Sequence, residues 1–539
     1  MNRDVAHLFK KFLEFHQTYE SSAKNVNYKS LELWNESVDQ FCSSVHAIMI
    51  SGSRYRSCFF SNMDGDDDRV MVGDDELVDL QQQTVACMGS LLEYDVVDEL
   101  LVDDEISVND DDSQSMLMLD QIICSLRNVY RLLHLLGEKY SDEKAKDISR
   151  PLKTEKIFKL LLRVMKKFSY TKVVTAHASM AIFQGIRGDA TCINLFVQNL
   201  GGIPFLLHIL LSEATVLLKL SIVRHIHMLL GFQVNQKMVA MLNRINECIR
   251  VELESEPENM YNITSNSTID LVHVFVGMAS WCIRSSAFPG ESGDDKRADL
   301  IEEIFQVLYL VQPTYTGNLA KHVKLSPSQE EKEEVMTQLG ILLCEILNLS
   351  HQDSRAYRVK LATVTLLMDM PSDYSQYLVL NGGIKQLLDI LDYQLSEAVI
   401  EKRQKASLSL TPILVVMNKL TSSNSTAKDI VKERIFPTND SDSENDVHKT
   451  GKAQNSPAEK QKNDSSSDRM KPKDAPYGTL RWKLIELMTN IDSYVKRCAS
   501  ELLWNICDEN AKEYVNRTGY GNAIHMLSIK GLVQLPSSK

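Results

Sequence analysis

Apolar residues recur at helical spacing through most of this chain, and the clearest case lies in residues 479–532. One stripe includes Leu480 and Leu484, and a second runs through 495–506. Intervals of three and four residues predict amphipathic helices. Asp492 stands at the break, where its short side chain can accept hydrogen bonds from the first amides of the next helix. Helices this short cannot each bury a full face alone, so we expect them to stack on neighbours.

The same spacing predicts helices over much of the upstream chain, and no run of eighteen uncharged apolar residues interrupts them. The most apolar region, 205–232, carries Glu213, Lys219 and Arg224, and is therefore expected to be a buried helix pair rather than a membrane span. The predicted upstream helices are 5–20, 28–50, 76–102, 115–138, 154–168, 214–232, 236–252, 269–284 and 297–312.

Two short segments repeat one another. Gly201-Gly202-Ile203 and Gly382-Gly383-Ile384, each followed by a Leu-Leu pair, are similar to the G-G-I-x-x-L-L turn of armadillo repeats and lie 181 residues apart. That distance is about four units of 40–47 residues. The first glycine lets a helix end in the left-handed region, and the second lets the next helix start at a steep angle. Residues 518–527 look like a third, divergent copy, with a turn predicted at 518–522.

Composition agrees with a helical array. The 22 glycines and 13 prolines are few for 539 residues, which disfavours a turn-rich β architecture. We therefore expect an all-α, armadillo/HEAT-like α-solenoid, a superhelix of stacked helix pairs. The ten cysteines are scattered without a C-x-x-C, so neither disulfides nor a zinc site are predicted and a reducing compartment fits. A net charge of −13 argues against general nucleic-acid binding.

Polar tracts divide the chain into three predicted regions. Residues 1–437 form helical repeats with acidic loops at 61–76 and 103–113, residues 438–478 form a disordered polar insert, and residues 479–539 form C-terminal helical repeats. The loop at 61–76 has aspartates at three EF-hand positions, but Arg69 replaces the required glycine, which favours a solvated loop over calcium. In the insert, Ser441 and Ser443 each have an acidic residue three positions later, which suits phosphorylation by an acidophilic kinase. The alternative is that the insert is an unmodified spacer.

No motif for covalent chemistry occurs. The chain has no G-x-x-x-x-G-K-[ST] loop to hold phosphates, no H-E-x-x-H and no G-x-S-x-G, so no catalytic residue, metal or cofactor is predicted. His225 and His227 are two residues apart on one helix and point to different faces, which indicates packing or surface roles. Trp482 and Trp504 lie on core-like faces.

The C-terminal pattern L-R-x-K-L-x-x-L-M-T-x-x-D-x-x-V-K-R, followed by A-x-E-x-L-x-x-x-C, T-G-Y-G-N-A and K-G-L, is similar to the synembryn family. Looser similarity starts at 325, with a helix that opens on S-Q-E, and includes T-P-I-L-V-V at 411–416. The residues that carry the denser match are Leu480, Arg481, Lys483, Leu484, Leu487, Met488, Thr489, Asp492, Val495, Lys496, Arg497, Ala499, Glu501, Leu503, Cys507, Thr518 to Ala523, Gly531 and Leu532.

The resemblance implies a cytosolic chaperone and guanine-nucleotide exchange factor for heterotrimeric G-protein α subunits (Gα), GDP-bound or nucleotide-free. It implies that the Gα C-terminal helix lies in a concave groove and that the nucleotide-free state is stabilised, without covalent chemistry. We expect a cytoplasmic monomer that reaches the cell cortex or membrane periphery through Gα, with no transmembrane segment and no nucleic-acid partner. The alternative is an armadillo-type scaffold that binds another helix or tail and leaves nucleotide exchange unchanged.

Cationic residues are the predicted contacts for the acidic end of that helix. The candidates are Lys402, Arg403 and Lys405, before the T-P-I-L-V-V stretch, and Lys496 and Arg497 in the C-terminal pattern. The first three fit an exposed helix end equally well, and the last two fit interhelical salt bridges. Synembryns usually continue past K-G-L into an acidic, phosphorylated segment and a helix that reaches the Gα switch region. Here Leu532 is followed by seven residues, so we expect weaker exchange activity.

Overall fold

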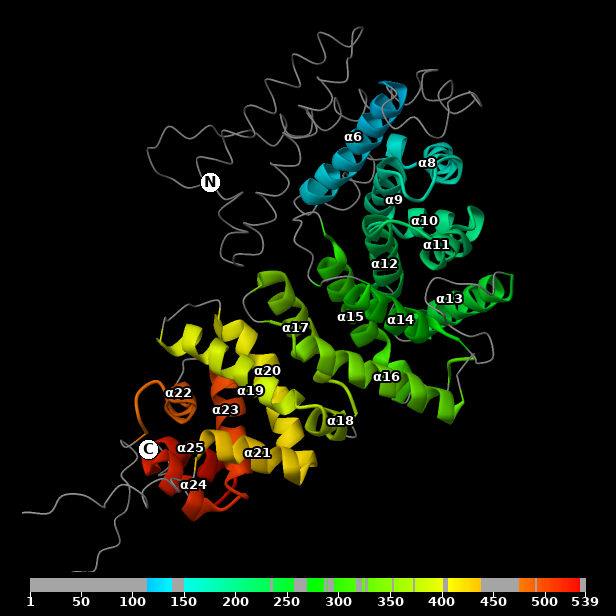
Figure 1. Ribbon diagram of the computed structural model, residues 1–539. Coiled ribbons are helices and arrows are strands. Elements are labelled where there is room, and N and C mark those ends of the chain that lie inside the picture. Colours follow the sequence, from blue (N-terminus) through cyan, green and yellow to red (C-terminus); the bar gives the residue numbers. More distant parts are fainter. Residues whose placement is uncertain are drawn as a thin grey trace, which may run out of the picture. The chain divides into compact units, whose positions relative to one another are not determined.

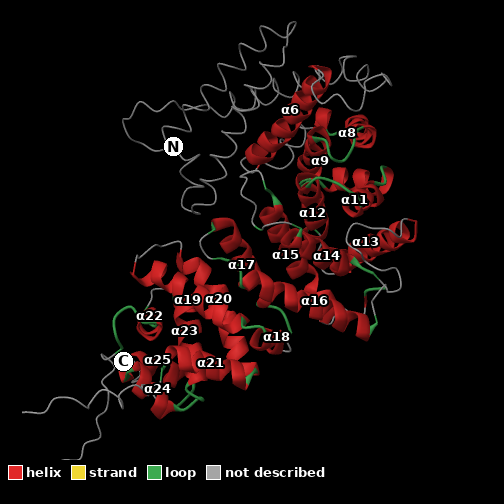
Figure 2. Ribbon diagram, in the orientation of Figure 1, coloured by secondary structure: helices red, strands yellow, loops and turns green. Residues whose placement is uncertain are grey.

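A computed structural model describes residues 114–137, 150–232, 236–255, 269–285, 288, 295–316, 322–324, 328–350, 353–371, 374–400, 406–437, 475–489 and 492–533. Every regular element in these ranges is a helix (Figure 2), which confirms the predicted all-α class of stacked helices. The chain divides into two compact units. The first holds residues 1–278, 291–310 and 319–327, and the second holds 279–290, 311–318 and 328–539.

The first unit is built from helices that lie close together in the sequence and pack on one another (Figure 1). Its elements are α6 (Gln114–Gly137), η1 (Arg150–Leu152), α8 (Glu155–Lys167), α9 (Val173–Ile186), α10 (Ala190–Asn194), the π-helical turn η2 (Leu195–Asn199), α11 (Gly202–Leu211), α12 (Val216–Gly231) and α13 (Gln236–Ser255). Helices α14 (Leu271–Arg284) and α15 (Arg297–Thr316) each have residues in both units.

Helix α9 forms the core of the first unit, because α6, α8 and α12 all pack against it. Its small side chains, among them Ala178 and Ala181, are fully buried and let the neighbouring helices approach closely. Gly185 is the tightest point. A Cβ there would lie 3.0 Å from the rings of both Phe158 on α8 and Tyr130 on α6.

The second unit is also an array of packed helices. Its elements are α16 (Gln329–Leu347), α17 (Ser354–Leu367), α18 (Tyr374–Leu380), α19 (Gly383–Leu395), the π-helical turn η4 (Ser396–Ile400), α20 (Ala406–Ser423), α21 (Ser425–Ile435), α22 (Leu480–Leu487), α23 (Ser493–Ile506), α24 (Ala511–Thr518) and α25 (Tyr520–Ile529).

Helices α20 and α23 share an extensive interface, although about seventy residues separate them in sequence. The apolar stripe predicted for 495–506 meets that of α20, and polar bonds flank it. Asn418 Nδ2 donates to the carbonyl of Cys498 at 2.9 Å, and Asn505 Nδ2 donates to Ser422 Oγ at 3.0 Å. The C-terminal helices are therefore part of the second unit's core.

Both glycine pairs behave as the sequence predicted. Gly201 and Gly382 adopt left-handed backbone with φ of 61° and 72°. The second glycine of each pair is required for a different reason. A Cβ on Gly202 would lie 2.3 Å from the ring of Phe196, and a Cβ on Gly383 would lie 2.8 Å from Leu378. The chain bends by 72° between residues 190–199 and α11. The repeated turn is thus a real structural repeat.

The expected third copy is different: a glycine with positive φ ends α24 as predicted, but the turn is confined to Gly519 instead of extending over 518–522. Gly519 has φ of 87° and ψ of 145°, outside the left-handed helical region, and α25 already begins at Tyr520. A single extended glycine joins α24 to α25, so Gly521 and Asn522 are helical. The physical reason is that glycine, which has no Cβ, can adopt extended backbone with positive φ, and one such residue is enough to redirect the chain.

Other boundaries match their predictions. Helix α6 corresponds to the predicted 115–138, and α8 and α12 to α15 fall within a few residues of their predicted ranges. Ser328 forms a capping box with Glu331 at the start of α16, as the S-Q-E opening suggested. The predicted helices before residue 103, the acidic loops at 61–76 and 103–113, and residues 438–474 of the insert predicted at 438–478 lie outside the described residues, whereas residues 475–478 are described.

Among the described helices, none is by itself long and apolar enough to cross a membrane. Residues 190–199 and α11 meet the length and composition criteria only when they are taken together across their 72° bend. Most of α11 is buried, which is what the core of a helical domain requires.

Candidate partner-binding surface

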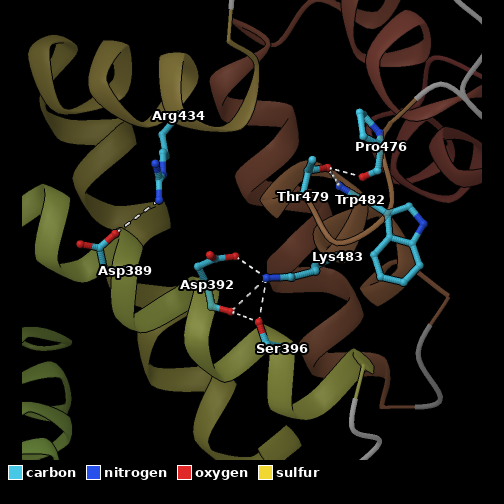
Figure 3. A network of polar contacts seen from close by, with 8 residues as sticks. All are labelled: Asp389, Asp392, Ser396, Arg434, Pro476, Thr479, Trp482 and Lys483. Atoms are coloured by element: carbon cyan, nitrogen blue, oxygen red, sulfur yellow. Dashed lines mark hydrogen bonds and ion pairs between the residues drawn. The ribbon is translucent and has the colours of Figure 1, made fainter. Parts of the chain in front are cut away.

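The C-terminal helices begin with a capped turn (Figure 3). Thr479 is the N-cap of α22, where its Oγ1 accepts from the Trp482 amide at 3.3 Å and donates to the Pro476 carbonyl at 2.8 Å. The Trp482 ring packs on Tyr477 with 4.5 Å between centroids. Trp482 is half-buried rather than in the core, which corrects its prediction, whereas Trp504 is 3% exposed and is a core residue as predicted.

A buried lysine joins α22 to α19. Lys483 Nζ lies 2.6 Å from Asp392 Oδ1 and donates to Ser396 Oγ at 2.7 Å, and its side chain is only 5% exposed (Figure 3). Ser396 Oγ in turn lies 2.8 Å from the Asp392 carbonyl. Because a buried ammonium is stable only when it is paired and hydrogen-bonded, this contact fixes where α22 lies on α19.

Two arginines hold α22 to α24 and to the end of α21. Arg481 Nη2 donates to the carbonyl of Arg517 at 2.8 Å. The guanidinium carbons of Arg481 and Arg517 lie 5.7 and 4.9 Å from the centroid of Phe436, which is 4% exposed. This is the range of cation–π attraction. Arg481, like Lys483, therefore stabilises the packing of the matched segment.

The turn between α23 and α24 is fixed by charge. Asp508 has a positive φ of 56°, and its carboxylate lies 2.6 Å from Lys428 Nζ and 2.7 Å from Lys432 Nζ. Hydrogen bonds from these two lysines lower the pKa of Asp508, and the hydrogen bond to Asp508 raises the pKa of Lys432. Both shifts keep the groups ionised, so the turn is held to α21 across the neutral pH range.

Most residues that carry the C-terminal pattern are needed for the fold. Asp492 caps α23 as predicted, since its carboxylate accepts from the amides of Tyr494 and Val495. The pattern residues buried in the core are Leu480, Leu484, Leu487, Met488, Val495, Ala499, Leu503, Cys507, Thr518 and Ala523. A pattern residue that stays exposed without such a role is therefore a better candidate for a partner contact.

One exposed stripe on α23 contains two such pattern residues, Arg497 and Glu501, beside Tyr494, which lies outside the pattern. Tyr494, Arg497 and Glu501 lie on one helix face because they are spaced by three and four residues. Tyr494 is 45% exposed, and the side chains of Arg497 and Glu501 are 52% and 44% exposed. The Arg497 guanidinium lies 5.1 Å from the Tyr494 ring centroid, and its Nε lies 3.7 Å from Glu501 Oε1. We call these three residues the α23 stripe.

The predicted contact residues are thus found in different settings. Arg497 belongs to the α23 stripe and pairs within its own helix rather than between helices, while its neighbour Lys496 is half-buried. Their role in binding stays a prediction. Lys402, Arg403 and Lys405 lie outside the described residues, as do Ser441 and Ser443.

Exposed apolar side chains in the same region were not identified from the sequence. Tyr520 is 56% exposed on α25, and Ile529 and Leu532 are each 55% exposed near its end. Exposed apolar residues of this size often mark contact surfaces. Tyr520 lies within the T-G-Y-G-N motif. Because this segment was predicted to be a turn, no exposed helix face was predicted there.

Nucleophilic chemistry has little support in the described residues. Burial raises the pKa of Cys192 and Cys507 to about 12 and that of Cys344 to about 11, so these thiols stay protonated and weakly reactive. His225 is fully buried as a packing residue, and His227 lies at the surface beside Glu303, as predicted. One group of three potential metal ligands, Asp120, Cys124 and His177, occurs in the described residues and is considered below.

Comparison with known proteins finds a family match in the C-terminal region. Residues 464–539 match the family model described as guanine nucleotide exchange factor synembryn. The Xenopus laevis protein named Chaperone Ric-8A is 51% identical over 55 residues, about 10% of each chain. The Gallus gallus protein of that name is 27% identical over 219 residues, 38% of this chain and 34% of the relative. The predicted resemblance is confirmed over these segments.

The matched segments span between a tenth and about a third of the length of these relatives. A crystal structure of an engineered protein aligns with 98% of this chain and 95% of its own at 14% identity and a TM-score of 0.42. That score is too low to bear on the fold or the function.

Proposed function

Residues 464–539 match the synembryn family model, and from this premise we propose that the protein is a chaperone and guanine-nucleotide exchange factor for heterotrimeric G-protein α subunits. The observation that carries the proposal is that the matched segment is an integral part of a folded unit. Helices α22 to α25 are held to α19, α20 and α21 by Lys483, Arg481 and the α20–α23 interface. The names of the relatives, Chaperone Ric-8A, support the same role.

The proposed mechanism needs no covalent step. The stacked helices take up the C-terminal helix of Gα and withdraw it from its own domain, which loosens the guanine-nucleotide site. Exchange then follows from a population shift, because the chain binds the open, nucleotide-free Gα more tightly than the closed form. Moving a 1:99 equilibrium to 99:1 requires about 10⁴-fold tighter binding of the open state, or about 5.5 kcal/mol. GTP binding closes Gα and releases it.

The cationic residues supply the contacts for the acidic end of the Gα helix. We assign this role to Lys402, Arg403, Lys405, Lys496 and Arg497. Arg497 is the best described of them, since its guanidinium is half-exposed and its packing over Tyr494 restricts its conformations before binding. Arginine and tyrosine are the side chains most often responsible for binding energy at interfaces.

The nucleotide state of Gα provides the test. Immobilised protein is incubated with purified Gα in GDP, after enzymatic removal of GDP, and in GTPγS. Greater capture after GDP removal and release by GTPγS support the proposal. Equal capture in all three states would instead support a helical scaffold that binds without affecting nucleotide exchange.

Cell location and stoichiometry complete the proposal. We propose a cytoplasmic monomer that reaches the membrane periphery only when it is bound to Gα. Fractionation of cells with and without Gα tests this, since membrane association that persists without Gα would require another attachment.

A further inference from the structure

We propose that Asp120, Cys124 and His177 form a zinc-binding site that connects α6 to α9 in the first unit. Asp120 and Cys124 are four residues apart on α6 and therefore share one helix face, and His177 lies on the adjoining face of α9. Helices α6 and α9 pack closely against each other (Figure 1). One ligand atom from each of the three side chains lies within 4.8 Å of the other two.

The hydrogen bonds of His177 bring the three potential ligands together. Its Nδ1 lies 2.7 Å from Asp120 Oδ1 and 3.1 Å from Cys124 Sγ. A protonated Nδ1 can donate to the carboxylate and to the sulfur together, because a thiol sulfur is also a weak acceptor, so these contacts hold the three groups close to one another. After the imidazole nitrogen and the thiol lose their protons, a metal ion can bind the nitrogen lone pair, the carboxylate and the thiolate together.

Other histidines in the described residues show what sets this group apart. His208 lies 2.6 Å from Glu252, and His273 lies 2.7 Å from Asp270, so a histidine paired with a carboxylate is ordinary in this protein. Among the described residues, His177 is the only histidine paired with a carboxylate that also has a cysteine close enough to form a group of three potential ligands.

The donor set indicates which metal fits. Thiolate, imidazole and carboxylate together suit zinc, whereas calcium and magnesium prefer oxygen ligands alone. Cys124 is 6% exposed, and the side chains of His177 and Asp120 are 18% and 19% exposed, so water can reach the group and supply a fourth ligand. The dication also balances the two negative charges of an ionised thiol and carboxylate.

Cobalt(II) substitution of the purified full-length protein tests the site. We expect one equivalent of Co²⁺ to bind with a thiolate-to-metal charge-transfer band and tetrahedral ligand-field bands, and Zn²⁺ to abolish both. Cys124→Ser and His177→Ala should each lose this signal. Cys248→Ser, a half-buried thiol on α13, and His208→Ala, the pair without a thiol, serve as matched controls and should retain it.

Zinc X-ray absorption on the unmodified protein gives an answer that does not depend on any variant folding. The proposal predicts one sulfur and three nitrogen or oxygen neighbours at zinc. Coordination by several sulfurs, the absence of sulfur, failure to bind one equivalent, or equal loss of the cobalt signal in the control variants would overturn it.

Discussion

Replacing Lys483 by methionine removes one charge from the contact between α22 and α19 while keeping a buried stem of similar length. The ammonium bonds both Asp392 Oδ1 and Ser396 Oγ, and its side chain is 5% exposed. We therefore expect α22 to detach from α19 more often in the variant, because nothing else in this contact pairs with the Asp392 carboxylate from α22.

The magnitude follows from the two bonds and the exposure of their partner. A hydrogen bond that involves a charged group contributes about 1.5–3 kcal/mol. Asp392 is 35% exposed, so water resolvates its carboxylate after the change and offsets part of the loss. The net cost should be about 2 kcal/mol, which corresponds to a roughly 30-fold increase in the opening equilibrium of α22.

Hydrogen–deuterium exchange measures this opening directly. Amides of residues 480–487 should lose about 30-fold protection in Lys483→Met, in keeping with a cost of about 2 kcal/mol. Lys512→Met on α24, where the lysine is exposed, is the matched control and should exchange like the unmodified protein. Unchanged protection of α22 in Lys483→Met would refute the view that this buried pair holds the family segment in place.

Three further predictions concern the exposed Arg497, the glycine pair at 201–202 and the buried His225. Arg497→Glu should weaken capture of nucleotide-free Gα about tenfold or more in a pull-down with an unchanged thermal midpoint, whereas Arg250→Glu, an exposed arginine paired on α13, should have no effect on capture. Gly202→Ala should lower the free energy of unfolding in urea by about 1–3 kcal/mol, because its Cβ would meet a buried ring at 2.3 Å. Gly201→Asn should lower it by less, because a Cβ on residue 201 would have no atom within 4 Å and asparagine tolerates its φ. Equal losses of stability in the two variants would contradict this. Burial lowers the pKa of His225 from 6.5 to about 4, so the unfolded chain binds a proton that the folded protein does not, and stability should fall as the pH drops from 6.5 toward 4. His225→Phe should have a thermal midpoint that falls less over that interval, and parallel pH profiles would contradict this.

Local sequence patterns predicted most of the helical architecture because the relevant physics is local. The two glycine pairs identified the bends at Gly201 and Gly382, and Asp492 and Ser328 identified two helix starts, since each effect involves residues only a few positions apart. The turn predicted at 518–522 is longer than the observed one because Gly519 alone redirects the chain, and sequence does not reveal the ψ that a glycine adopts.

Contacts between distant residues could not be predicted in the same way. Lys483 and Asp392 are 91 residues apart, and His177 is 57 residues from Asp120. The i and i+4 spacing of Asp120 and Cys124 was visible, but a ligand from a second helix was needed before it indicated metal binding. The α23 stripe was partly visible through Arg497, whereas the exposure of Tyr494 beside it depends on how α23 packs on α20.

The rate of GDP release from purified Gα tests the central claim most directly. Gα loaded with fluorescent GDP is mixed with the full-length protein, and release is followed with and without excess GTPγS. The account predicts faster release, a stable nucleotide-free complex when GTPγS is absent, and dissociation of that complex when it is added. A release rate that is the same with and without the protein, at concentrations where Gα is bound, would contradict it.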